Sequence, residues 1–170
     1  MIPGEAAYIE AVHAMVDGLV APLSKRLGAR LVCRLGCSSC CVDDLTVFEV
    51  EAAPIRLAYP EVLAGEPAAV GGCAMLGPSG ECRVYAARPY VCRTQGLPLR
   101  WAEAGVEHRD ICRLNDNEDD LLSLSPEDCW TLGPVESRLA AAQARSVGGE
   151  GLRVSLRSLF QAPVNVQANR

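Results

Sequence analysis

The chain has 170 residues, a length typical of one domain, and its net charge of −5 argues against nucleic acid as the main partner. Almost half of the residues are apolar but only 5% are aromatic, which favours helices packed through small residues over an aromatic-rich β-sandwich. A chain of this length buries roughly 70% of its unfolded surface. It therefore does not need disulfide cross-links to fold, so its nine cysteines need another explanation.

The N-terminal residues Met1–Tyr8 contain neither a basic segment nor a long apolar one, so we expect no signal peptide. We also expect no membrane span, because no apolar run approaches the required length. These observations predict a cytoplasmic protein with no membrane partner. Cytosolic thiols stay reduced, so clustered cysteines in that compartment indicate metal or redox sites rather than disulfides.

Apolar residues recur at helical spacing from Ala6 to Leu27, which predicts a helix that stops at Gly28. Pro22 is expected to kink or split this helix. His13 lies beside the apolar stripe, and we interpret it as a boundary residue in preference to a metal ligand.

The next predicted helix follows the first group of cysteines. Thr46-x-x-Glu49 matches a capping box and predicts a helix that begins at Thr46 and ends by Pro60. The thiols just before it would lie near a helix N-terminus, where the helix dipole stabilises a thiolate.

Turn residues dominate the middle of the chain. Gly77–Gly80 predicts a chain reversal with Cys73 and Cys82 at its two ends. Leu97–Trp101 and Val106–Arg109 could form a short β-hairpin. The acidic run Asp116–Asp120 is interpreted as a solvated loop, because it lacks the spacing of a calcium-binding loop.

The C-terminal part is predicted to be helical. Pro134 opens a helix that runs to Gly148, and Ser155 is expected to cap a last short helix. The predicted fold class is therefore mainly α: a small single-domain helical metalloprotein with cysteine-rich loops. We place its single domain at residues 1–170, with a motif core at 31–115 and C-terminal helices at 126–161.

The strongest signal for function is the run Cys33-x3-Cys37-x2-Cys40-Cys41, which places four thiols within nine residues. Structural zinc sites usually pair two Cys-x2-Cys motifs, whereas only one is present here. The adjacent side chains of Cys40 and Cys41 also diverge, which suits one tetrahedral zinc ion poorly. The spacing therefore favours an iron–sulfur cluster, 4Fe-4S in type, over zinc. His108, four residues before Cys112, could complete a mixed zinc site.

Basic and aromatic residues accompany the cysteines. An arginine directly follows four of them and could offset thiolate charge: Arg34, Arg83, Arg93 and Arg113. Tyr85 and Arg88 lie between Cys82 and Cys92. We interpret these two residues, with Arg93 and His108, as supports that surround the metal ligands, in preference to a substrate pocket.

These motifs resemble a bacterial cysteine-cluster family called YkgJ-like. The resemblance covers residues 31–115 and depends on the double cysteine together with Arg88-Pro89-x-x-Cys92-Arg93. Members of that family are described as zinc- or iron-chelating domains or iron–sulfur-cluster proteins. The resemblance implies eight metal-site cysteines: Cys33, Cys37, Cys40, Cys41, Cys73, Cys82, Cys92 and Cys112. Cys129 matches nothing in the family pattern.

The sequence leaves two functions open. The first is a metal-binding protein whose cluster or zinc ion has a structural, electron-transfer or metal-handling role. The second is a cluster-dependent enzyme of methyl-transfer or radical type, because Cys33-x3-Cys37-x2-Cys40 is also the pattern of radical S-adenosylmethionine enzymes. Such an enzyme would keep an open metal position facing a cleft lined by Tyr85, Arg88 or His108. The chain is too short, and has too few predicted strands, for the β/α barrel of those enzymes.

Overall fold

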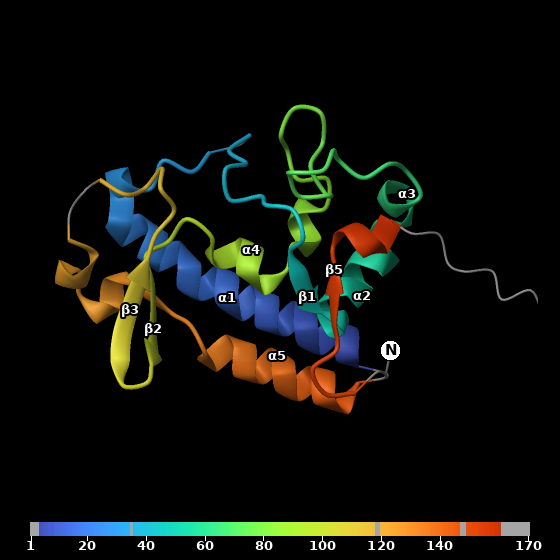
Figure 1. Ribbon diagram of the computed structural model, residues 1–170. Helices are drawn as coiled ribbons and strands as arrows, with labels where there is room; N and C mark the ends of the chain where they lie inside the picture. The colour runs from blue at the N-terminus through green and yellow to red at the C-terminus, as the bar shows by residue number, and fades with distance from the viewer. Residues whose placement is uncertain (1–3, 35, 118–119, 147–148, 161–170) are drawn as a thin grey trace, which may run out of the picture.

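The long N-terminal helix α1 crosses the molecule, and α2, α4 and α5 pack against it (Figure 1). The computed structural model describes residues 4–34, 36–117, 120–146 and 149–160. Residues 118–119 of the acidic run and Gly148 of the predicted helix stop lie outside the described residues.

The α-helices are α1 (Glu5–Leu27), α2 (Glu49–Ala58), α3 (Pro60–Leu63), α4 (Tyr90–Thr94) and α5 (Pro134–Arg145). The strands are β1 (Thr46–Phe48), β2 (Leu99–Glu103), β3 (Val106–Asp110), β4 (Trp130–Thr131) and β5 (Arg153–Ser155). The 3₁₀ helices are η1 (Gly28–Arg30), η2 (Tyr85–Ala87), η3 (Leu121–Ser123), η4 (Pro126–Asp128) and η5 (Arg157–Phe160).

The prediction of a mainly α fold is wrong, because two small sheets accompany the helices. The structure is 46% helix and 13% strand. In one sheet β1 pairs antiparallel with β5, and in the other the order is β3-β2-β4, with β4 parallel to β2. The β2–β3 hairpin was expected, whereas the β1–β5 pair joins segments about a hundred residues apart, a contact that local spacing does not reveal.

The capping-box interpretation of Thr46 is also wrong. Thr46 faces Ser155 across the β1–β5 pair, and α2 begins only at Glu49, after Phe48. Pairing with β5 supplies hydrogen-bond partners for the backbone N–H and C=O groups of Thr46–Phe48. This segment therefore stays extended, although its sequence matches a capping box. The predicted helix at Pro134 is confirmed as α5.

One face of α1 forms the main core. Ile9, Val12 and Val16 are buried there against α2, α4 and α5, and Pro22 lies inside the helix without ending it. The expectation that no apolar run is long enough for a membrane span needs correction, since Glu5–Arg30 meets that test by length and composition. In the structure the apolar face of this helix is used to form the protein core.

A second, smaller core includes three of the cysteines. It joins α2 and β1 to the C-terminal segment through residues such as Val47, Ile55 and Leu156. Cys73 belongs to this core, and Cys41 and Cys82 pack against it. The fold therefore brings cysteines from separate parts of the chain to one side of α2.

Candidate metal centre

The cysteine loop that follows η1 folds back on itself through two tight turns. The backbone N–H of Cys37 donates to Arg34 O at 2.9 Å, and that of Cys41 donates to Ser38 O at 2.9 Å. Gly36 adopts a positive φ of 83°, a conformation that favours glycine. All nine cysteines of the chain are free thiols. The turn chemistry expected from the glycine and serine residues is therefore present.

A second cysteine-bearing segment packs directly on this loop. As predicted, Gly77–Gly80 reverses the chain: the N–H of Gly77 donates to Glu81 O at 2.8 Å, and Leu76 forms a bridge with Cys82. A Cβ atom on Gly80 would lie only 3.4 Å from Gly36 O, so the turn and the cysteine loop are in close contact. Figure 1 shows both loops on the same side of the molecule, away from α5.

Five cysteines lie close enough for their charges to interact, and we call them the inner thiol group: Cys40, Cys41, Cys73, Cys82 and Cys92. The pKa of Cys92 is raised to about 12. Burial is the main cause, and the charges of Cys73, Cys82 and Cys40 add to it. Burial also raises the pKa of Cys73 and of Cys82, and Cys82 is affected by the charge of Cys73. The backbone contributes to this arrangement, since the N–H of Cys73 donates to Cys41 O at 2.9 Å.

The adjacent thiols of Cys40 and Cys41 shift each other's pKa in opposite directions. The thiol of Cys41 donates a hydrogen bond to the sulfur of Cys40, which lowers the pKa of Cys40 to about 6. The same hydrogen bond, with burial and the charges of Cys40, Cys73 and Cys92, raises the pKa of Cys41. Cys40 is therefore the member of the inner thiol group that ionises most readily.

We call the other three predicted ligands the outer thiol group: Cys33, Cys37 and Cys112. The hydroxyl oxygen of Ser39 lies 3.9 Å from the sulfur of Cys37 and 3.9 Å from that of Cys112. A surface cavity of about 360 Å³ adjoins Cys37 and is also lined by Arg34, Ser38 and Leu114. The sulfurs of Cys37 and Cys112 therefore lie near an exposed hydroxyl group.

Asn115 and Gly96 hold Cys33 in its place. The side-chain amide of Asn115 is buried; it donates to Cys33 Sγ at 3.3 Å and to Gly96 O at 2.7 Å, and it accepts from Val32 N at 2.9 Å. Gly96 has a φ of 91°, and a Cβ atom there would lie 2.7 Å from Cys33 Sγ. Asn115 lies at the end of the segment that resembles the family, but the sequence did not reveal the contact of either residue with Cys33, which lies more than 60 positions away.

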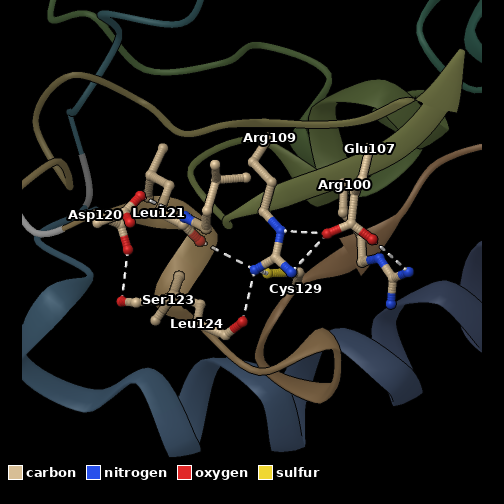
Figure 2. A network of polar contacts seen from close by, with 9 residues as sticks. Arg100, Glu107, Arg109, Asp120, Leu121, Ser123, Leu124 and Cys129 are labelled. Atoms are coloured by element: carbon tan, nitrogen blue, oxygen red, sulfur yellow. Dashed lines mark hydrogen bonds and ion pairs between the residues drawn. The ribbon is translucent and has the colours of Figure 1, made fainter.

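Cys129 lies in a different environment, a network around Arg109 (Figure 2). The guanidinium of Arg109 donates to Cys129 Sγ at 3.3 Å, to Leu124 O at 2.7 Å and to the carboxylate of Glu107. Burial raises the pKa of Cys129, and the charge of Arg109 acts in the opposite direction. These contacts give Cys129 a packing role in the loop between β3 and β4.

The predicted supporting residues make their contacts in three places. The guanidinium of Arg93 donates hydrogen bonds to Arg88 O at 2.9 Å and to the carboxylate of Asp17 at 2.5 Å. Because Arg93 lies on α4 and Asp17 on α1, these bonds connect the two helices. Arg88 lies over the ring of Tyr85, 4.0 Å from its centroid, and its charge favours the thiolate of Cys82 against the effect of burial. His108 stacks on Trp101 in the β2–β3 hairpin, with ring centroids 5.4 Å apart.

The donor set suits a soft metal, since thiolates are preferred ligands of zinc and of iron–sulfur clusters. Within the described ranges, however, no three His, Cys, Asp or Glu side chains surround one point closely enough to hold a metal ion. The structure brings cysteines from different segments into the inner thiol group without fixing the coordination geometry.

Comparisons with known proteins identify the family. No curated protein and no solved structure matches the chain. The family CxxCxxCC, described as "Putative zinc- or iron-chelating domain", matches residues 32–129, which is more than half of the chain. This match agrees with the YkgJ-like resemblance and includes every cysteine in the sequence. The chain therefore belongs to the CxxCxxCC family of zinc- or iron-chelating cysteine-cluster domains.

Proposed function

We propose that the protein binds an iron–sulfur cluster through the inner thiol group and has an electron-transfer, structural or metal-handling role. The observation that carries this proposal is the approach of five thiols from three segments of the chain. Cys40 and Cys41 come from the cysteine loop, Cys73 and Cys82 flank the Gly77–Gly80 turn, and Cys92 comes from α4.

The number of thiols favours a cluster over a single zinc ion. Structural zinc is almost always four-coordinate, whereas five cysteines interact here. Iron–sulfur clusters accept more varied cysteine spacings, which suits an adjacent pair such as Cys40 and Cys41. Zinc at the same thiols is the alternative within this proposal.

The environment of the thiols also supports a bound metal. Buried thiols with raised pKa values are poor thiolates on their own, and a metal ion offsets the charge that burial penalises. A cytoplasmic location forms part of the proposal, because a reducing compartment keeps free thiols available for metal. The charges of Arg83 and Arg88 partly oppose the effect of burial on Cys82.

The enzyme alternative receives less support. An open metal position was expected to face a cleft lined by Tyr85, Arg88 or His108. Neither the cavity beside Cys37 nor a second cavity, of about 460 Å³ near Glu49 and Arg56, is lined by any of these three residues. We therefore propose metal binding as the function and make no proposal of catalysis.

The decisive experiment is anaerobic purification followed by counts of iron, zinc and acid-labile sulfide per chain. We expect iron and sulfide in similar amounts, with a brown colour that bleaches on exposure to air. A colourless protein with one zinc per chain would replace the cluster by zinc. Absence of both metals after reconstitution with iron, sulfide or zinc would refute the proposal.

A further inference from the structure

Arg157 reaches from the C-terminal segment to the end of the cysteine loop. It belongs to η5, directly after β5, and lies outside the family match at residues 32–129. Its Nε atom donates to Asp43 Oδ1 at 2.8 Å, and its Nη2 atom lies 2.7 Å from the same oxygen. Asp43 comes two residues after Cys41, so this ion pair fixes the backbone at the end of the cysteine loop.

The same guanidinium also fastens the segment that leads to Cys73. Its Nη1 atom donates to Ala68 O at 2.8 Å and its Nη2 atom donates to Gly72 O at 3.0 Å. The second oxygen of Asp43 accepts from Gly71 N at 2.9 Å. Arg157 and Asp43 thus form one polar unit that binds two backbone segments at once.

We infer that Arg157 is a positioning residue of the inner thiol group, which sets the spacing between the backbone at Cys41 and the backbone at Cys73. The direct hydrogen bond from Cys73 N to Cys41 O, 2.9 Å long, lies beside this polar unit. The inference rests on the proposed function, because it assigns Arg157 to the geometry in which these two thiols meet a metal. A planar guanidinium is required, since a lysine ammonium cannot donate to Asp43 and to both carbonyls in this fork arrangement.

The test compares three variants of the full-length protein: Arg157→Gln, Arg157→Lys and, as a matched control, Arg153→Gln. Arg153 lies on β5, donates to Thr46 O at 2.7 Å and stacks on Phe48. Its removal disturbs the same strand pair without touching the segments that carry Cys41 and Cys73. The first readout is the rate at which the metal-loaded protein loses metal to a chelator.

A second readout does not depend on metal. In the metal-free protein, mass spectrometry measures the rate at which N-ethylmaleimide labels Cys73, which is 8% exposed. For both Arg157 variants we expect faster labelling of Cys73 and metal loss about 10–100-fold faster, the usual effect of removing a residue that orients metal ligands. Arg153→Gln should stay close to wild type in both readouts.

Several outcomes would overturn the inference. Wild-type rates for Arg157→Gln would remove the role altogether, and wild-type rates for Arg157→Lys would show that charge alone matters. Equal effects of Arg153→Gln would reduce the role to general stability of the β1–β5 pair. If Arg157→Gln fails to fold, Asp43→Ala replaces it in the test, because it removes the carboxylate that Arg157 binds. N-ethylmaleimide should then label Cys73 faster in Asp43→Ala than in the wild type. A wild-type protein that binds no metal would refute the proposed function, while Cys73 labelling would still decide the role of Arg157.

Discussion

The inner and outer thiol groups differ in what surrounds their sulfurs. Cys73 belongs to an apolar core with Val47 and Leu156, and burial raises the pKa of its thiol. In the outer thiol group, a serine hydroxyl approaches Cys37 and a side-chain amide bonds Cys33. Because a free thiolate is penalised most in apolar surroundings, a bound metal stabilises the inner sulfurs more than the outer ones. The comparison supports our proposal that the inner thiol group, more than the outer one, holds the metal.

The largest expected effect comes from removing one thiol of each group. Cys92→Ser should abolish most metal binding and lower the midpoint of thermal unfolding, because metal binding and folding are coupled. Cys37→Ser should lower the metal count less. Metal analysis and thermal unfolding of the two purified variants provide the measurement. Equal losses in both variants would indicate that all eight cysteines form one site.

The next effect concerns the accessibility of the thiols. In the metal-free protein at pH 8, N-ethylmaleimide should label Cys33, which is exposed, well before Cys73 and Cys92. Burial leaves the latter two sulfurs less accessible, and their raised pKa values leave less thiolate at that pH. Peptide mass spectrometry over a time course measures the order. Simultaneous labelling would mean that the inner thiol group is as open to solvent as the outer one.

A smaller effect is expected at the support of Cys33. Gly96→Ala places a methyl group against Cys33 Sγ and should cost about 1–3 kcal/mol of unfolding free energy, the usual cost of overpacking. Gly105→Ala is the matched control, since Gly105 also has a positive φ but no atom within 4 Å of an added Cβ. Urea unfolding of both variants measures the difference. Identical losses would show that backbone strain alone is responsible.

The smallest effect is expected at Cys129, which belongs to neither group. Cys129→Ser should leave the metal content unchanged, because this sulfur contacts Arg109 in the loop between β3 and β4. The free energy of unfolding of the Cys129→Ser variant should change only slightly, since the serine hydroxyl can also accept a hydrogen bond from the guanidinium of Arg109. Metal counts on the variant provide the check, and a clear loss of metal would place Cys129 among the ligands.

Local patterns predicted several elements correctly. The helical spacing after Ala6, the proline at the start of α5 and the turn residues between β2 and β3 each act within a few residues, and the structure contains α1, α5 and the hairpin. Thr46 shows where such patterns fail. Its capping-box match was outweighed by pairing with Ser155, which lies near the other end of the chain.

The candidate site was predictable in its chemistry but not in its arrangement. The cysteine spacing and the family resemblance predicted that thiols are the metal donors, and membership of the CxxCxxCC family is confirmed. The individual ligands remain predictions. The division into two groups depends on which loops pack together, as when Gly80 approaches Gly36. Arg157 was missed because its partner Asp43 lies 114 residues away and neither residue belongs to a motif.

The β1–β5 pair decides which residues are needed when this domain is fused to another protein. β5 and η5 lie beyond the family match, yet Leu156 and Leu159 complete the core that contains Cys73. A chimera that grafts only residues 32–129 onto a foreign scaffold would expose that core and lose the partner strand of β1. A fusion protein that is meant to contain the folded cysteine domain therefore has to include β5 and η5 as well as residues 32–129.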